Sequence, residues 1–264
     1  MIRPLLVSAT AAAAFLAMPT AASAQAFDAV RLGPGTASGG QAGLAAIAGR
    51  AYPGGDEERL RVLPWVNYRW SNGWFAGVGN GIGYVFPSAS PEFQYGVRLT
   101  GDFGRKSRRS PVLAGLDDID ASPELGAFFN WNLSRELSLT TSIRYGAGND
   151  HDGLKFDVGA QYGWMLSPSW RAGVGVSAGF GNANIVQDYF GVPADRATAD
   201  RPAYTPDGGL TEVRASVSLG WAITADWSAF GALSVTSWEG DAGDSPLVRE
   251  RRPIGGVLGV SRSF

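Results

Sequence analysis

Apolar and polar residues alternate along most of the chain after residue 24. From Leu154 to Trp164, every even position is apolar, and the odd positions are Lys155, Asp157, glutamine or glycine. Side chains of a β-strand point alternately to its two faces, so this pattern predicts a strand with one apolar and one polar face. Similar runs cover residues 59–70, 93–104, 136–147, 169–182 and 210–223.

The length of these runs and their aromatic ends indicate strands that cross a membrane. They are about 10 to 13 residues long, close to the about 9–11 of a tilted membrane strand and longer than the about 5–6 of a soluble sheet. A soluble antiparallel sheet also alternates, but it has no reason to carry aromatic residues at strand ends. Tryptophan and tyrosine settle at the level of lipid headgroups. The aromatic residues at the ends of apolar faces are Trp70, Trp74, Tyr145, Trp164, Trp170, Trp221 and Trp227.

The pattern therefore predicts an all-β fold, a transmembrane antiparallel β-barrel in the outer membrane of a Gram-negative-type bacterium. The barrel must close, because an open sheet edge in lipid would leave backbone amides unpaired. Eleven runs can be counted, whereas bacterial single-chain barrels have an even number of strands. We expect twelve strands, with ten as the alternative; the missing one is either residues 26–33 or a split of 74–86 at its glycine cluster. The runs are 41–51, 59–70, 74–86, 93–104, 124–133, 136–147, 154–166, 169–182, 210–223, 226–238 and 252–264.

The connections predict the orientation of the barrel. Short ones at 131–136, 166–169 and 224–226 alternate with long ones, and barrels of this class place short turns in the periplasm and long loops outside. The long connections are 105–122, 149–153, 186–208 and 239–250.

The N-terminus reads as a signal peptide, residues 1–24, followed by one barrel domain, residues 25–264. Arg3 precedes an apolar stretch, and Ala22-Ser23-Ala24 is a small-residue cleavage site. A retained membrane anchor is the alternative, but the apolar stretch is short for a spanning helix.

Composition excludes several classes of function. With 22 basic and 24 acidic residues, the chain lacks the basic surface of a nucleic-acid binder. It has no cysteine and a single histidine, which excludes disulfides, a cysteine nucleophile and sites built on several histidines. We expect no cofactor and no metal centre.

Several loop motifs resemble those of the MipA/OmpV family of outer-membrane proteins. The chain also ends in Phe264 on an alternating strand, which resembles the signal read by the barrel-assembly machinery; Arg262 departs from it, where an aromatic residue is expected. The likeness covers essentially the whole mature chain and rests on the order and spacing of the motifs together. They are Ala51-Tyr52-Pro53-Gly54-Gly55, Leu113-Ala114-Gly115-Leu116-Asp117-Asp118-Ile119, Asp188-Tyr189-Phe190-Gly191-Val192, Ala203-Tyr204-Thr205-Pro206-Asp207-Gly208-Gly209-Leu210 and Gly240-Asp241-Ala242-Gly243-Asp244-Ser245-Pro246-Leu247-Val248.

The resemblance implies a non-enzymatic outer-membrane barrel. For the founding member it also implies a scaffold that links a murein transglycosylase to a murein synthase, and other relatives are tied to adhesion or antibiotic susceptibility. The expected partners are therefore outer-membrane lipid and lipopolysaccharide, the barrel-assembly machinery and periplasmic murein enzymes.

Charged residues on the polar faces predict a charged lumen. Such a lumen could select small anionic solutes, which makes a narrow channel the alternative function. It could equally be a salt-bridged plug, because barrels of about 8 strands are filled by side chains and those of about 16 are open. The expected lumen residues are Arg59, Arg61, Arg69, Arg98, Asp102, Glu124, Arg144, Lys155, Asp157, Arg171, Glu212 and Arg214.

Two loops carry candidate chemistry. His151 lies between Asp150 and Asp152, an arrangement that can orient an imidazole for acid–base work in an outer-membrane hydrolase. The loop has no serine, however, and its sequence is ordinary for a hairpin turn, so hydrolysis ranks third.

The loop after residue 104 combines both signs of charge. Asp117, Asp118 and Asp120 could bind a divalent cation or be solvated. The run Arg105-Lys106-Ser107-Arg108-Arg109 could bind lipopolysaccharide phosphates or be neutralised by the same carboxylates.

Overall fold

A computed structural model describes residues 38–264, which form a closed antiparallel barrel of twelve strands. The predicted fold class and strand number are confirmed. The signal peptide and the candidate strand at 26–33 lie outside the described residues. Each strand pairs with its neighbour in sequence, and β1 closes the barrel on β12, with Leu44 opposite Val260.

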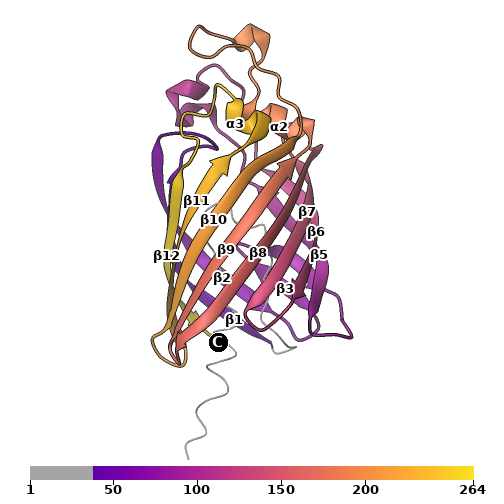
Figure 1. Cartoon of the computed structure of the whole chain (residues 1–264), viewed down its shortest axis with the longest axis vertical. Coiled ribbons are helices and arrows are strands. Elements are labelled where there is room, and N and C mark those ends of the chain that lie inside the picture. Colours follow the sequence, from indigo (N-terminus) through magenta and orange to yellow (C-terminus); the bar gives the residue numbers. More distant parts are fainter. Residues whose placement is uncertain (1–37) are drawn as a thin grey trace, which may run out of the picture.

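The strands of the front wall run almost the full height of the barrel (Figure 1). The twelve strands are β1 Gly39–Arg50, β2 Glu58–Arg69, β3 Trp74–Gly77, β4 Gly81–Val85, β5 Phe93–Asp102, β6 Ser122–Asn132, β7 Leu137–Ala147, β8 Gly153–Ser167, β9 Trp170–Gly181, β10 Gly209–Ala222, β11 Trp227–Trp238 and β12 Ile254–Ser263.

The glycine cluster divides the run at 74–86 into two short strands. β3 has four residues and β4 has five, and they pair as a hairpin from Trp74 opposite Tyr84 to Gly77 opposite Gly81. Gly81 has φ 75°, a left-handed conformation that favours glycine, so the chain turns there. This split supplies the twelfth strand. It also adds a short connection, residues 78–80, on the side of the long loops, so short and long connections do not alternate at this hairpin.

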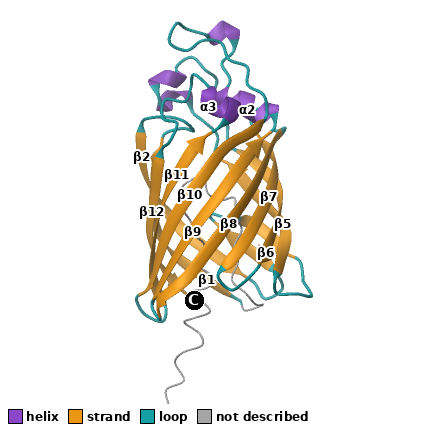
Figure 2. Ribbon diagram, viewed as in Figure 1, coloured by secondary structure: helices purple, strands orange, loops and turns teal. Residues whose placement is uncertain are grey.

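Structured loops cover the end of the barrel that carries the long connections (Figure 2). We expected plain loops there, but residues 183–190 form a helix. Asn182 caps α2 by accepting a hydrogen bond from the Ile185 amide at 3.2 Å. The remaining elements of this cap are α2 Ala183–Phe190, α3 Gly240–Asp244 and three short 3₁₀ segments, η1 Ser107–Arg109, η2 Pro111–Leu113 and η3 Ala194–Arg196.

Two buried apolar clusters hold the cap in place. One lies under α2, where Ile185, Val186, Tyr189 and Phe190 pack against the barrel residue Trp238. The other joins the loops above it and consists of Tyr52, Leu113, Leu116, Val192 and Leu247. Burial of apolar surface therefore fixes the cap to the barrel mouth.

The outer wall of the barrel is apolar. Leu60 and Leu258 are each 71% exposed, and aromatic residues such as Trp74 and Trp227 are exposed near the turn end. Trp170 and Trp221 stack there, with ring centroids 5.3 Å apart. A closed barrel with an apolar exterior and aromatic girdles is the architecture of an outer-membrane protein. Within residues 38–264, no helix is long and apolar enough to span a membrane.

Substituting Gly43 by valine is expected to destabilise the seam between β1 and β12. A Cβ atom at Gly43 would lie 1.9 Å from the carbonyl oxygen of Val260, whereas one at Gly49 would meet nothing within 4 Å. Overpacking of this kind costs at least about 1–3 kcal/mol. The folded fraction, read from heat-modifiable gel mobility, should fall for Gly43→Val and stay unchanged for Gly49→Val. Equal folding of the two variants would contradict the seam contact.

Candidate functional site in the barrel lumen

The lumen contains two cavities at different heights. The upper one, below the cap, has a volume of about 240 Å³ and is lined by charged residues including Glu124 and Lys155. The lower one, at the turn end, has about 1200 Å³ and is lined by polar residues such as Arg69 and Arg171. Because short turns mark the periplasmic side, the larger cavity is a vestibule facing the periplasm.

A layer of buried aromatic residues lies between the two cavities. Along β2, Trp65 lies midway between Arg61, which lines the upper cavity, and Arg69, which lines the lower one. Trp65 packs on Phe230 at 5.2 Å between ring centroids, and Phe75 packs on Phe128 at 6.0 Å. All but Phe230 are less than 5% exposed. We call these four residues the aromatic layer.

Five of the predicted lumen residues form one connected ion-pair cluster in the upper cavity. Glu124 is fully buried, with Arg144 at 3.4 Å and Lys155 at 3.2 Å. Arg144 also pairs with Asp157 at 3.0 Å, and Lys155 pairs with Asp102 at 2.7 Å. These contacts join β5, β6, β7 and β8 on the inside of one wall, so the cluster ties the wall together.

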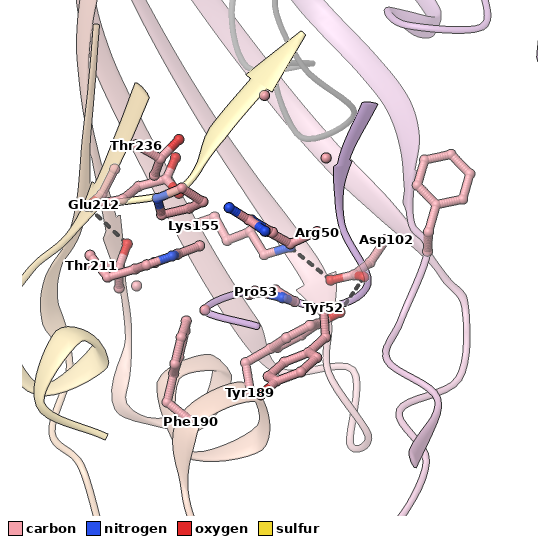
Figure 3. A pocket seen from close by; sticks show the side chains of 18 of the residues that line it. Arg50, Tyr52, Pro53, Asp102, Lys155, Tyr189, Phe190, Thr211, Glu212 and Thr236 are labelled. Atoms are coloured by element: carbon pink, nitrogen blue, oxygen red, sulfur yellow. Dashed lines mark hydrogen bonds and ion pairs between the residues drawn. The ribbon is translucent and has the colours of Figure 1, made fainter. Parts of the chain in front are cut away.

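The cap is bonded to this cluster through α2. The Tyr189 hydroxyl donates a hydrogen bond to Asp102 at 2.5 Å, and Figure 3 shows Tyr189 and Lys155 both directed to that carboxylate. The Arg105 guanidinium donates to the Tyr189 carbonyl oxygen at 2.8 Å. The upper cavity is thus closed on its extracellular side by side chains that are bonded to the wall.

The other predicted lumen residues lie outside the five-residue cluster. Arg214 pairs with Glu212 at 2.6 Å on the opposite wall. Arg98 donates to Ser142 at 2.8 Å near the aromatic layer, and Arg69 and Arg171 lie in the vestibule. Arg59 and Arg61 lie within electrostatic range of Arg109 on the cap.

Tyr189 and Arg201 were not proposed as site residues from the sequence, and Arg105 was expected only as part of a basic run for lipopolysaccharide phosphates. Arg201 donates hydrogen bonds to the carbonyl oxygens of Val112 and Ala114, at 2.6 and 2.9 Å, and so orders the outer loops. Tyr189 lies in one of the motifs that carried the family resemblance, and that motif was the available signal.

A comparison with known protein families identifies the family of this chain. The profile of the family described as MltA-interacting protein MipA matches residues 42–264. The chain belongs to the MipA family. A comparison with curated proteins gives no match.

Solved structures similar to this MipA-family barrel are distant from it in sequence. The NanC porin has a TM-score of 0.49 and 13% identity, over 83% of this chain and 98% of that one. An outer-membrane channel from Pseudomonas putida F1 has a TM-score of 0.47 and 13% identity, over 92% and 100%. The KdgM porin has a TM-score of 0.45 and 11% identity, over 85% and 99%. Similarity at this level does not show that the barrel shares the function of these proteins.

The loop chemistry of the MipA-family barrel is largely structural. His151 is exposed in the turn between β7 and β8 with φ 58°, a left-handed position typical of turns. Asp118 accepts hydrogen bonds from the Ser107 amide and hydroxyl, and it shares Lys106 with Asp120. Among residues 38–264, no group of three acidic, histidine or cysteine side chains could hold a metal ion. These contacts favour the interpretation of Lys106 as neutralised by the carboxylates.

Phe264 lies at the turn end of the seam. Its backbone exchanges two hydrogen bonds of 3.0 Å with Gly40, and its ring lies 6.1 Å from that of Tyr68. The side chain is 68% exposed. Its reading by the barrel-assembly machinery stays a prediction.

The cap is expected to loosen at high pH because of Tyr52. Its hydroxyl donates to the Leu247 carbonyl oxygen at 2.9 Å, and burial, together with Glu57, raises the pKa of Tyr52 to about 12. The neutral phenol is favoured in the folded state. Its contribution is therefore complete below pH of about 10, the ordinary value, and is lost as pH rises through about 12. A shift of this size is worth about 2–3 kcal/mol.

Protease cleavage of the outer loops should therefore increase between pH 10 and 12. The Tyr52→Phe variant should lose part of this increase, whereas Tyr162→Phe, on the exposed outer wall, should retain it. Identical pH profiles for Tyr52→Phe and the unchanged protein would show that this phenol does not hold the cap. Burial and Asp102 also raise the pKa of Tyr189, so some of the dependence should remain in Tyr52→Phe.

Proposed function

We propose that this MipA-family barrel acts as a scaffold at its periplasmic end, where it holds a murein-remodelling enzyme at the outer membrane. The partner class follows from the family description, because the protein it names interacts with MltA, a murein transglycosylase. No catalytic step is assigned to the barrel itself.

The division of the lumen is the observation that carries this proposal. The cap and the aromatic layer lie one above the other, and only the vestibule of about 1200 Å³ is left at the periplasmic end. A barrel built to pass solutes gains nothing from two barriers in series. In a barrel that only presents a surface to the periplasm, the cap and the aromatic layer stabilise the upper half and block nothing that has to pass.

The connection between β4 and β5, residues 86–92, is the longest of the turns at that end. The Ser88 hydroxyl donates to the Ser90 carbonyl oxygen at 2.8 Å, and the Tyr95 hydroxyl donates to that of Pro87 at 3.3 Å. The Asn132 amide donates to the Glu92 carbonyl oxygen at 2.7 Å, which ties the segment to the next turn. A preformed loop loses little conformational entropy when a partner binds.

Binding to solubilised outer-membrane proteins tests the scaffold. The immobilised full-length barrel should retain a murein transglycosylase, identified by mass spectrometry. Replacement of residues 87–91 by glycine and serine should abolish retention, whereas the same replacement at 197–200 in the extracellular cap should not. Retention of no murein enzyme, or equal retention by both variants, would reject the proposal.

A narrow anion channel is the second candidate, and Arg69 and Arg171 in the vestibule favour it. Two guanidinium groups at a pore entrance concentrate small anions by their field. In planar bilayers such a channel would give small, anion-selective steps. A silent bilayer would remove this candidate and leave the scaffold unaffected.

A further inference from the structure

The barrel wall has a gap above the short hairpin of β3 and β4. β2 pairs with β3 only from Asn67 to Arg69, and β5 pairs with β4 only up to Leu99. Above these points, no strand in the described part of the chain lies between residues 58–65 of β2 and residues 100–102 of β5. At about 4.8 Å per strand spacing, the two missing strands leave about 14 Å of wall to be spanned.

The sequence of β2 is that of a free edge in this region. The backbone N–H and C=O groups at odd positions of this segment point to β1; for example, the Glu57 carbonyl oxygen accepts a hydrogen bond from the Ala51 amide. Those at even positions point to the other side, where the Val66 carbonyl oxygen accepts a hydrogen bond from the Val78 amide. Pro64 is at an even position, so its nitrogen, which carries no hydrogen, faces the unpaired side and no strand hydrogen bond is lost. Proline in a sheet is confined to such edges. Backbone groups at Leu60 and Val62 point to the same gap and need water or a ligand there.

A segment of the cap closes the gap from above. The Ser110 hydroxyl donates a hydrogen bond to Glu57, directly before β2, so the chain after β5 crosses to the top of β2. The gap is therefore a window framed by β2, the β3–β4 hairpin, β5 and η1. Residues of this frame, among them Arg61, Gly101 and Arg109, also line the cavity of about 240 Å³. The window thus borders the upper cavity.

The two sides of the frame differ in chemistry. The outer rim is apolar, with Leu60, Val62 and Leu99 exposed to 71%, 63% and 52%. The inner rim is basic, because Arg59, Arg61 and Arg109 lie within electrostatic range of one another. Within residues 38–264, no carboxylate forms an ion pair with these three, and Nε of Arg61 is buried without a hydrogen-bond partner.

We propose that the window binds an anionic lipid of the surrounding bilayer, with its phosphate on the inner arginines and its acyl chains along the outer rim. Guanidinium groups bind phosphate through paired, charge-assisted hydrogen bonds. Three cations without an ion pair in the described chain favour an anion that arrives through lipid. Asp118, which lies in electrostatic range of Arg109, is itself bound by Ser107 and Lys106. A free anion from water would leave the apolar rim and the open edge of β2 in contact with lipid. The site is separate from the periplasmic surface of the scaffold.

Native mass spectrometry of the full-length barrel, released from nanodiscs, tests the site. Dioleoyl phosphatidic acid should remain bound, and dioleoyl phosphatidylcholine and inorganic phosphate should not. The Arg61→Gln and Arg109→Gln variants should each weaken binding about tenfold, as expected for loss of a hydrogen bond between charged groups. Arg252→Gln, an exposed arginine on the same side of the membrane, should bind as the unchanged protein does. Heat-modifiable mobility confirms that each variant is folded.

A second measurement does not depend on the arginines. The chain has no cysteine, so a fluorophore can be attached at Leu63→Cys on the inner side of the window, or at Ser177→Cys on the opposite wall. Brominated phosphatidic acid in the bilayer should quench the first label and spare the second. Equal quenching of both labels, or binding of inorganic phosphate as tight as that of the lipid, would overturn the proposal.

Discussion

Replacing Glu124 by alanine is expected to lower the free energy of unfolding by about 1.5–3 kcal/mol, because its contacts with two buried cations are lost. Glu124 is fully buried and faces Arg144 at 3.4 Å and Lys155 at 3.2 Å. The substitution removes one of three carboxylates, and Arg144 and Lys155 each keep one partner, Asp157 and Asp102. The penalty comes from the charge-assisted contacts that Glu124 makes with both cations, which are lost in a buried site.

Urea titration of the barrel reconstituted in liposomes measures this loss. Asp226→Ala is the matched control, because its partner Arg262 is 3.9 Å away and both side chains are 61% exposed. An exposed pair of this kind contributes less than about 1 kcal/mol. Glu124→Gln, which keeps the shape and one acceptor oxygen, should fall between the alanine variant and the unchanged protein. A Glu124→Ala barrel as stable as the control would show that water reaches the cluster.

The barrel was predictable from the sequence because strand period and membrane burial act on every residue. Between Leu154 and Trp164, a shift of one residue would turn Lys155 and Asp157 into lipid, so the pattern determines which face is inside. The strand number was less certain, since the glycines between Trp74 and Val85 are compatible with one long strand or two short ones. Only closure of the whole barrel decides between them.

The sequence predicted which charged residues face the lumen, but it did not predict which of them contact one another. Lys155 and Asp102 are 53 residues apart, and their contact depends on the register of three strand pairs between them. The cap was missed for a different reason. α2 has eight residues, too few to be stable alone, and burial of residues such as Tyr189 and Phe190 against the barrel stabilises it.

Joint removal of the cap and the aromatic layer is expected to convert the barrel into an open pore. The two barriers stand in series, so loss of either one leaves the path closed by the other. Replacing residues 183–190 by glycine and serine removes α2 and the Tyr189 contact with Asp102. Trp65→Ala and Phe128→Ala remove two side chains that are 4% exposed and meet the lumen between the cavities.

Planar-bilayer recordings should give ion-conducting steps at least about tenfold larger for the combined variant than for either partial one, because conductance in series is limited by the narrowest remaining constriction. Trp221→Ala, on the exposed outer wall, should leave the recordings unchanged. This variant controls for any general effect of losing an aromatic side chain on the barrel. Full opening by the α2 replacement alone would mean that the aromatic layer is permeable. In that case the barrel would be a gated channel, and the argument for a scaffold from two barriers would fail.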